Sequence, residues 1–116
     1  MAFVRCVGNS GGTDTSREPD KLYQNASMAQ NATANITVTQ MPKVIEMVES
    51  NTGGSAVVGV YNVEQNTGWL IGYFSGAMHS QSWNGSNYFT SITSSNVAFK
   101  NAGFSGTSRV TVAIFY

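Results

Sequence analysis

Few side chains of this sequence could act as acids, bases or nucleophiles, and their spacing fits no familiar catalytic arrangement. His79 is the only histidine, so two imidazoles from one chain cannot bind a metal ion together. A Ser-His-Asp arrangement would have to combine His79 with a distant acid. Gly8-Asn9-Ser10-Gly11-Gly12 has the Gly-x-Ser-x-Gly spacing, but no helix is expected after it, so it does not indicate a nucleophile elbow. We therefore expect no enzyme, and keep a small hydrolase that uses His79 or a carboxylate as the third alternative.

Two carboxylates, Glu46 and Glu49, lie close together in an apolar segment. Glycoside hydrolysis needs two carboxylates that face each other, and an odd offset along a strand places these two on opposite faces. The apolar neighbours of Glu46 would raise its pKa, although a charge on an edge strand is the simpler interpretation. Cys6 is the only cysteine, so we expect no internal disulfide, no zinc site, and no other metal or cofactor.

Ligand binding is easier to motivate than catalysis. The segment 78–88 combines two aromatic rings with amides, hydroxyls and an imidazole. Sugars are held by an aromatic face and by hydrogen bonds from planar amides, so the segment predicts a candidate carbohydrate site. Its residues would be Trp83, Asn84, Asn87, Tyr88 and His79. The alternative is that Trp83 closes one end of a folded sheet and that Asn84-Gly85 is an ordinary turn.

The composition describes a neutral protein that is poor in charge. Lys, Arg, Asp and Glu make up 10% of the 116 residues, six bases balance six acids, and no charged residue occurs from Gln65 to Phe99. This balance predicts no attraction to nucleic acid. No apolar run reaches the length of a membrane span and no signal peptide is recognisable, so we expect neither membrane insertion nor standard export. A charge-poor segment is typical of surface that becomes covered in an assembly.

The segment Val57–Ser75 is the centre of the expected fold. Two runs rich in β-branched and aromatic residues flank Glu64–Gly68, which has the composition of a hairpin loop with Gly68 free to take positive φ. Side-chain alternation puts apolar residues on both faces of this hairpin, so it needs two covers. We expect four residues to lie in the core or at a subunit interface: Tyr61, Trp69, Ile71 and Tyr73. Replacing Trp69 with Ala is expected to cost about 3–5 kcal/mol, as for a buried aromatic.

Short strands account for most of the remaining chain. We expect them at residues 3–7, 35–40, 43–50, 88–93, 96–100 and 109–116, and we interpret 24–34 as irregular or a weak edge strand and 75–87 as a loop. About eight short strands without a convincing helix predict an antiparallel β-sandwich, of jelly-roll or H-type-lectin-like layout. Residues 34–116 would form the sandwich. Residues 1–33 would be a strand plus a polar segment, a candidate anchor whose residues 9–33 could order on docking to a larger protein.

Two segments resemble small β-sandwich proteins of tailed bacteriophages. Ile36–Ile45 is an alternating strand, then Pro42-Lys43, then a second apolar run, and Ile92–Phe104 precedes a last strand that ends at an aromatic residue. The segments resemble tail, baseplate, fibre-tip and decoration proteins, and the layout is similar to that of H-type lectins. The resemblance implies a homotrimer that binds other virion proteins, made in the bacterial cytoplasm and located in the virion.

We therefore expect a non-enzymatic virion structural protein of the tail, fibre or capsid-decoration type, with a host-surface glycan as a further partner. The alternative is a lectin-like carbohydrate-binding module.

Overall fold

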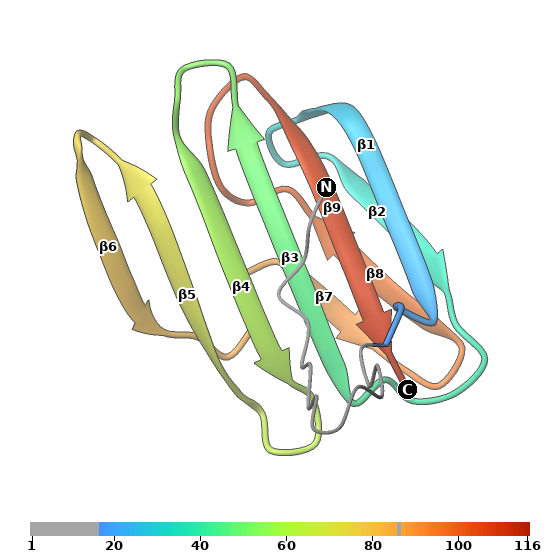
Figure 1. The fold of residues 1–116 in the computed structure, drawn as a ribbon. Helices are drawn as coiled ribbons and strands as arrows, with labels where there is room; N and C mark the ends of the chain where they lie inside the picture. The colour runs from blue at the N-terminus through green and yellow to red at the C-terminus, as the bar shows by residue number, and fades with distance from the viewer. Residues whose placement is uncertain (1–16, 86) are drawn as a thin grey trace, which may run out of the picture.

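The computed structural model describes residues 17–116 apart from residue 86, and this part of the chain is all β (Figure 1). It contains nine strands where the sequence predicted about eight: β1 (Lys21–Ala29), β2 (Thr33–Thr37), β3 (Val44–Asn51), β4 (Ala56–Asn62), β5 (Thr67–Phe74), β6 (Ala77–Ser82), β7 (Phe89–Ile92), β8 (Asn96–Lys100) and β9 (Thr107–Phe115). The prediction of an antiparallel β-sandwich is confirmed.

The two layers differ in size. The larger sheet has six strands in the order β1-β9-β3-β4-β5-β6, and the smaller has three in the order β2-β8-β7. In Figure 1 the small sheet lies behind β1, β9 and β3, while the β5–β6 hairpin stands out on the left, away from it. We call the face of the large sheet that is turned toward the small sheet the inner face, and the opposite one the outer face.

The core lies between the two sheets and follows the period-two alternation of the strands. On β9, within the strand expected at residues 109–116, the side chains of Val110, Val112 and Ile114 are fully buried. Ile45 and Met47 on β3 and Phe99 on β8 are equally inaccessible. Ile36 and Val38 are buried, whereas the alternating Thr37 and Thr39 are exposed.

Three local expectations need correction. The segment 75–87, expected to be a loop, contains β6, which pairs with β5 over its full length. The segment 24–34 contributes β1 and the start of β2, so the edge-strand interpretation was the better one. In the hairpin, Asn66 rather than Gly68 has the positive φ, of 53°. Gly68 lies in β5, where an added Cβ would stand 2.3 Å from the carbonyl oxygen of Val60, so this site requires glycine for close approach.

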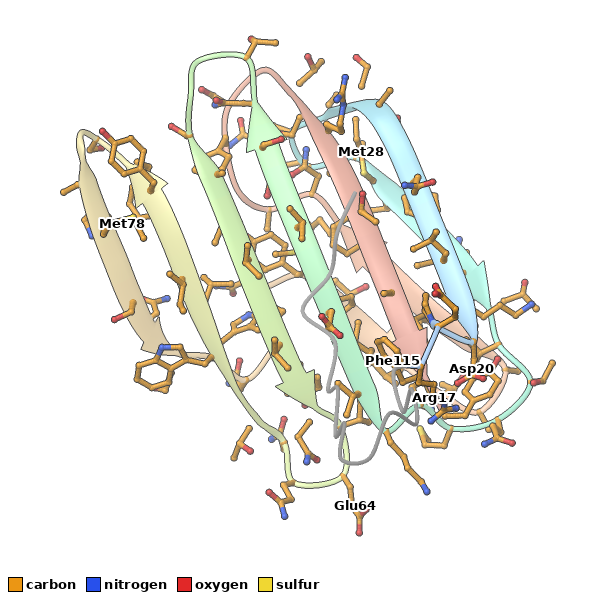
Figure 2. The ribbon with its side chains drawn as sticks, viewed as in Figure 1. Arg17, Asp20, Met28, Glu64, Met78 and Phe115 are labelled. Carbon is orange, nitrogen blue, oxygen red and sulfur yellow. The ribbon has the colours of Figure 1, made fainter. Side chains whose placement is uncertain are left out.

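Residues 21–33, which the sequence assigned to an N-terminal segment, lie within the sandwich, because β1 pairs with β9 from Lys21–Ile114 to Ala29–Thr107. The expected strand at residues 3–7 and residues 9–16 of the candidate anchor lie outside the described residues. The carboxyl-terminal strand β9 is held between β1 and β3, and its apolar end is anchored by hydrogen bonds. The Asp20 carboxylate accepts hydrogen bonds from the Tyr116 amide (2.7 Å) and from Arg17 (2.5 Å), beside the end of β9 (Figure 2).

Candidate functional sites

An apolar patch on the outer face is the most conspicuous surface feature. Val60 on β4 lies opposite Trp69 on β5, Val58 lies opposite Ile71, and Tyr73 lies opposite Met78 on β6. Directly opposed residues of antiparallel strands project to the same face, so these six side chains are contiguous. They are 39–65% exposed. We call this set, Val58, Val60, Trp69, Ile71, Tyr73 and Met78, the outer patch.

The size of the outer patch sets it apart from the scattered exposed hydrophobics of ordinary surfaces. Six large side chains that are each about half exposed present roughly 600 Å² of apolar surface. The largest patch on a typical monomer covers about 300–600 Å² and is itself often functional. No Lys, Arg, Asp or Glu occurs anywhere between Gln65 and Phe99, so the patch has no charged residue on β5 or β6.

The structure divides the four predicted core or interface residues between the two faces of the hairpin. Tyr61 is buried in the core, with 5% of its surface exposed, whereas Trp69, Ile71 and Tyr73 belong to the outer patch. The two-sided pattern predicted for the hairpin is therefore confirmed. The expected loss of about 3–5 kcal/mol for Trp69→Ala is corrected, because that range applies to a buried aromatic and the Trp69 side chain is half exposed.

The predicted binding residues lie partly around a cavity at the end of β5 and β6. The cavity has a volume of about 370 Å³. Its lining is rich in amides and hydroxyls and consists of Asn66, Thr67, Gly68, Gln81, Ser82, Trp83, Asn84 and Asn87. The Tyr61 hydroxyl donates to Oδ1 of Asn66 and fixes one amide of the wall. The Trp83 amide donates to the Gly68 carbonyl at 2.9 Å and closes the β5–β6 side.

The two aromatic residues of the candidate carbohydrate site are core residues rather than a stacking platform. Trp83 is 6% exposed, and its ring lies 5.7–5.9 Å from the rings of Tyr61, Tyr88 and Phe89. Tyr88 is 7% exposed and stacks on Phe99. Burial raises the pKa of Tyr88 to about 12, and the negative charge of Glu49 adds to the effect. The alternative interpretation of Trp83, as a plug over the end of the sandwich, agrees with this packing, and Gly85 takes the positive φ of a turn.

His79 is not part of this cavity lining. Its ring stacks on Phe74 with centroids 4.0 Å apart, and Nε2 lies 3.2 Å from the Phe74 carbonyl oxygen. Sequence reasoning missed Gln81 and Ser82, because it treated 75–87 as a single loop. It also missed Asn66, which lies in the hairpin loop before β5. A strand at β6 would have indicated that Gln81 returns to the start of β5.

The two glutamates of β3 lie on opposite faces, as their odd offset predicted. Glu46 is on the outer face, opposite Val60 and Ala113, and burial raises its pKa. Glu49 is fully buried on the inner face, where one carboxylate oxygen accepts from Ser108 Oγ (2.8 Å) and from the Phe104 amide (3.1 Å). The other oxygen of Glu49 has no hydrogen-bond partner among the described residues.

Within residues 17–116 apart from 86, no three His, Cys, Asp or Glu side chains gather to hold a metal ion. The same residues contain no helix that is long and apolar enough to cross a membrane. The chain matches no protein-family model, no curated protein and no solved structure. Its function is therefore proposed from its residues and their geometry.

Proposed function

We propose that the protein is a non-enzymatic structural component of a bacteriophage virion, a tail, fibre or capsid-decoration subunit, that assembles with copies of itself through the outer patch. The exposure of this patch carries the proposal of assembly. A standard interface takes about 800 Å² from each partner, and the patch supplies most of that area in apolar atoms. Its lack of charge lets two copies approach without like-charge repulsion.

The virion part of the proposal has a different support. It rests on the resemblance of residues 36–45 and 92–104 to small phage β-sandwich proteins, and on the charge-poor, amide-rich composition. The resemblance implies a trimer, other virion proteins as partners and a location in the particle. Mass spectrometry of particles purified from the producing bacterium tests this part. Peptides of this chain at a constant ratio to the major virion protein would support it, and their absence from the particles would contradict it.

Native mass in solution, measured by light scattering behind a sizing column, tests the proposed assembly. We expect a stable oligomer that Ile71→Thr weakens, because this substitution keeps a β-branched strand former and removes apolar surface from the patch. Leu22→Thr is the matched control, since Leu22 on β1 is similarly exposed (50% against 45%) but lies outside the patch. A wild-type chain that remains a monomer at high concentration would contradict self-assembly.

The amide-lined cavity favours a second candidate, a lectin-like module that binds a neutral sugar. Amides and hydroxyls from Asn66, Gln81, Ser82 and Asn87 can hydrogen-bond sugar hydroxyls, although Trp83 offers no free ring face. The test is titration with a panel of monosaccharides, followed by nuclear magnetic resonance. Binding that is lost in Gln81→Ala and Asn87→Ala, and kept in His79→Ala, would support the module. Unperturbed cavity resonances at saturating sugar would exclude it for that panel.

A further inference from the structure

β6 is an open edge of the large sheet. Its only strand neighbour among the described residues is β5, all six of its side chains are exposed, and its register with β5 runs without a bulge from Trp69–Ser82 to Phe74–Ala77. It contains no charged residue and no proline. The opposite edge, β1, has Lys21 and a register shift between Asn25 and Met28. Charges, prolines and bulges are the usual protection of an edge strand, so β6 lacks the protection that β1 has.

The turn before β6 determines which backbone groups point to the free edge. Ser75 and Gly76 have φ values of 53° and 75°, as in a two-residue type I′ turn, so Phe74 and Ala77 form a hydrogen-bonded pair. Such pairs alternate along an antiparallel ladder, so Ala77, His79 and Gln81 bond to β5. The bond from the Trp83 amide to the Gly68 carbonyl continues the same alternation. The N–H and C=O groups of Met78, Ser80 and Ser82 therefore point away from β5.

We propose that β6 pairs in antiparallel orientation with β6 of a second copy of this chain, about a two-fold axis at Ser80. Opposed residues in such a pair must project to the same face. With the axis at Ser80, each Ser80 faces its equivalent, and Met78 faces Ser82 of the partner subunit. In this register every free N–H and C=O of the two edges meets a partner. A shift by two residues in either direction would leave a free pair of groups on each copy.

The side chains along this seam fit a second copy of the same chain. Two neutral strands meet without like-charge repulsion, and the small Ser80 side chain can face itself at the axis. The long Met78 side chain lies opposite the short Ser82 of the partner subunit. Because Met78, Ser80 and Ser82 share the outer face with Tyr73, Ile71 and Trp69, the two outer patches become one continuous surface. The pairing goes beyond the proposed assembly through the outer patch, because it is a separate contact that leaves the joined patch exposed. It requires an even number of copies, unlike the trimer that the resemblance implies.

Ser80→Pro is the first test, with native mass as the measurement. The Ser80 N–H makes no bond to β5, so proline costs the isolated chain no ladder hydrogen bond, while its ring blocks the seam. Circular dichroism melting shows whether the variant is folded, and Ser80→Thr, which keeps the N–H, is the matched control. We expect Ser80→Pro to halve the native mass and Ser80→Thr to leave it unchanged. A folded Ser80→Pro variant with wild-type mass would overturn the pairing, and so would a wild-type trimer.

Cysteine crosslinking tests the register itself, in a Cys6→Ser background. A hydrogen-bonded pair has Cα atoms about 5.5 Å apart, which a disulfide can span. Ser80→Cys should therefore give a covalent dimer on mild oxidation. Met78→Cys should not, because the two Met78 positions are separated by four residues along the seam. Mixing Met78→Cys chains with Ser82→Cys chains should restore the crosslink. Equal crosslinking of Ser80→Cys and Met78→Cys would refute the register.

The failure of the pairing and the failure of the proposed function give different results. A wild-type trimer that Ile71→Thr dissociates would exclude the β6 pair and leave self-assembly through the outer patch intact. A wild-type monomer with no Ser80→Cys crosslink would exclude both. A dimer that Ser80→Pro dissociates and Ile71→Thr does not would support the pair and assign no assembly role to the patch.

Discussion

The contact between Gly59 and Trp83 gives a sharp test of the packing that closes the end of the sandwich. A Cβ added to Gly59 would lie 2.4 Å from Cζ3 and 2.9 Å from Cη2 of Trp83. The ring cannot easily withdraw, because the rings of Tyr61, Tyr88 and Phe89 surround it. We expect Gly59→Ala to cost about 1–3 kcal/mol of unfolding free energy, the usual range for overpacking a core.

The same contact predicts a coupling between two substitutions. Trp83→Phe removes the part of the indole that carries Cζ3 and Cη2, and should cost less than the ~3–5 kcal/mol of a full truncation. In that background the new methyl group of Gly59→Ala enters the vacated space, so its cost should fall close to zero. The coupling energy in the double-mutant cycle should be about 1–3 kcal/mol, well above the roughly 0.5 kcal/mol expected of independent sites.

Urea unfolding followed by circular dichroism measures each corner of this cycle. Trp69→Phe is the control background, because Trp69 lies on the outer face, and there Gly59→Ala should keep its full cost. An equal cost of Gly59→Ala in the wild-type and Trp83→Phe backgrounds would refute the packing described for Trp83. That result would also favour the alternative in which the Trp83 ring is accessible to a ligand.

Three further predictions concern buried and ionisable groups. Gly103→Ala should cost about 1–3 kcal/mol in denaturant unfolding, because its Cβ would stand 2.2 Å from the carboxylate oxygen Oε1 of Glu49, whose other oxygen is held by two hydrogen bonds. The pKa of Tyr88 is raised from 10.0 to about 12, so the stability that its neutral hydroxyl contributes is complete below pH 10 and is lost as the pH rises toward 12. The melting temperature of Tyr88→Phe should therefore fall less at alkaline pH than that of the wild type. Burial likewise raises the pKa of Glu46, so the stability contributed by its protonated carboxyl is lost as the pH rises through that pKa. Glu46→Gln should therefore raise the melting temperature at pH 7 but not in acid.

The sequence was most informative where one face of a strand is buried and the other is not. In β4 buried and exposed residues alternate from Val57 to Tyr61, in agreement with the alternation predicted for the hairpin. The sequence did not reveal β6, because neither face of this strand is buried. All its side chains are exposed, so neither face needed apolar residues and no alternation arose. The backbone ladder to β5 and the Ser75-Gly76 turn hold this strand, and that dipeptide was the available signal.

The candidate binding residues show what residue type alone cannot decide. Aromatic rings beside amides suit a sugar site and suit a sandwich end equally well, because both uses need a large apolar surface next to polar groups. A sugar site and a sandwich end differ in the number of neighbours around the aromatic ring, and those neighbours come from other parts of the chain. Tyr61, Phe89 and Gly59 determine the surroundings of Trp83, and none of them lies in the segment 78–88.

The same reasoning explains why the hairpin is the part of the molecule most suited to assembly. A strand pair with apolar residues on both faces gains stability only when both are covered. The inner face of β4 is covered by the chain itself, through Val57 and Tyr61, while Val58 and Val60 on its outer face stay about 40% exposed. Strand geometry alone would accept threonine at these outer positions at little cost. The outward positions carry valine, isoleucine, tryptophan and tyrosine instead, which favours a cover from outside the chain. The self-assembly proposed above would provide such a cover without introducing charge.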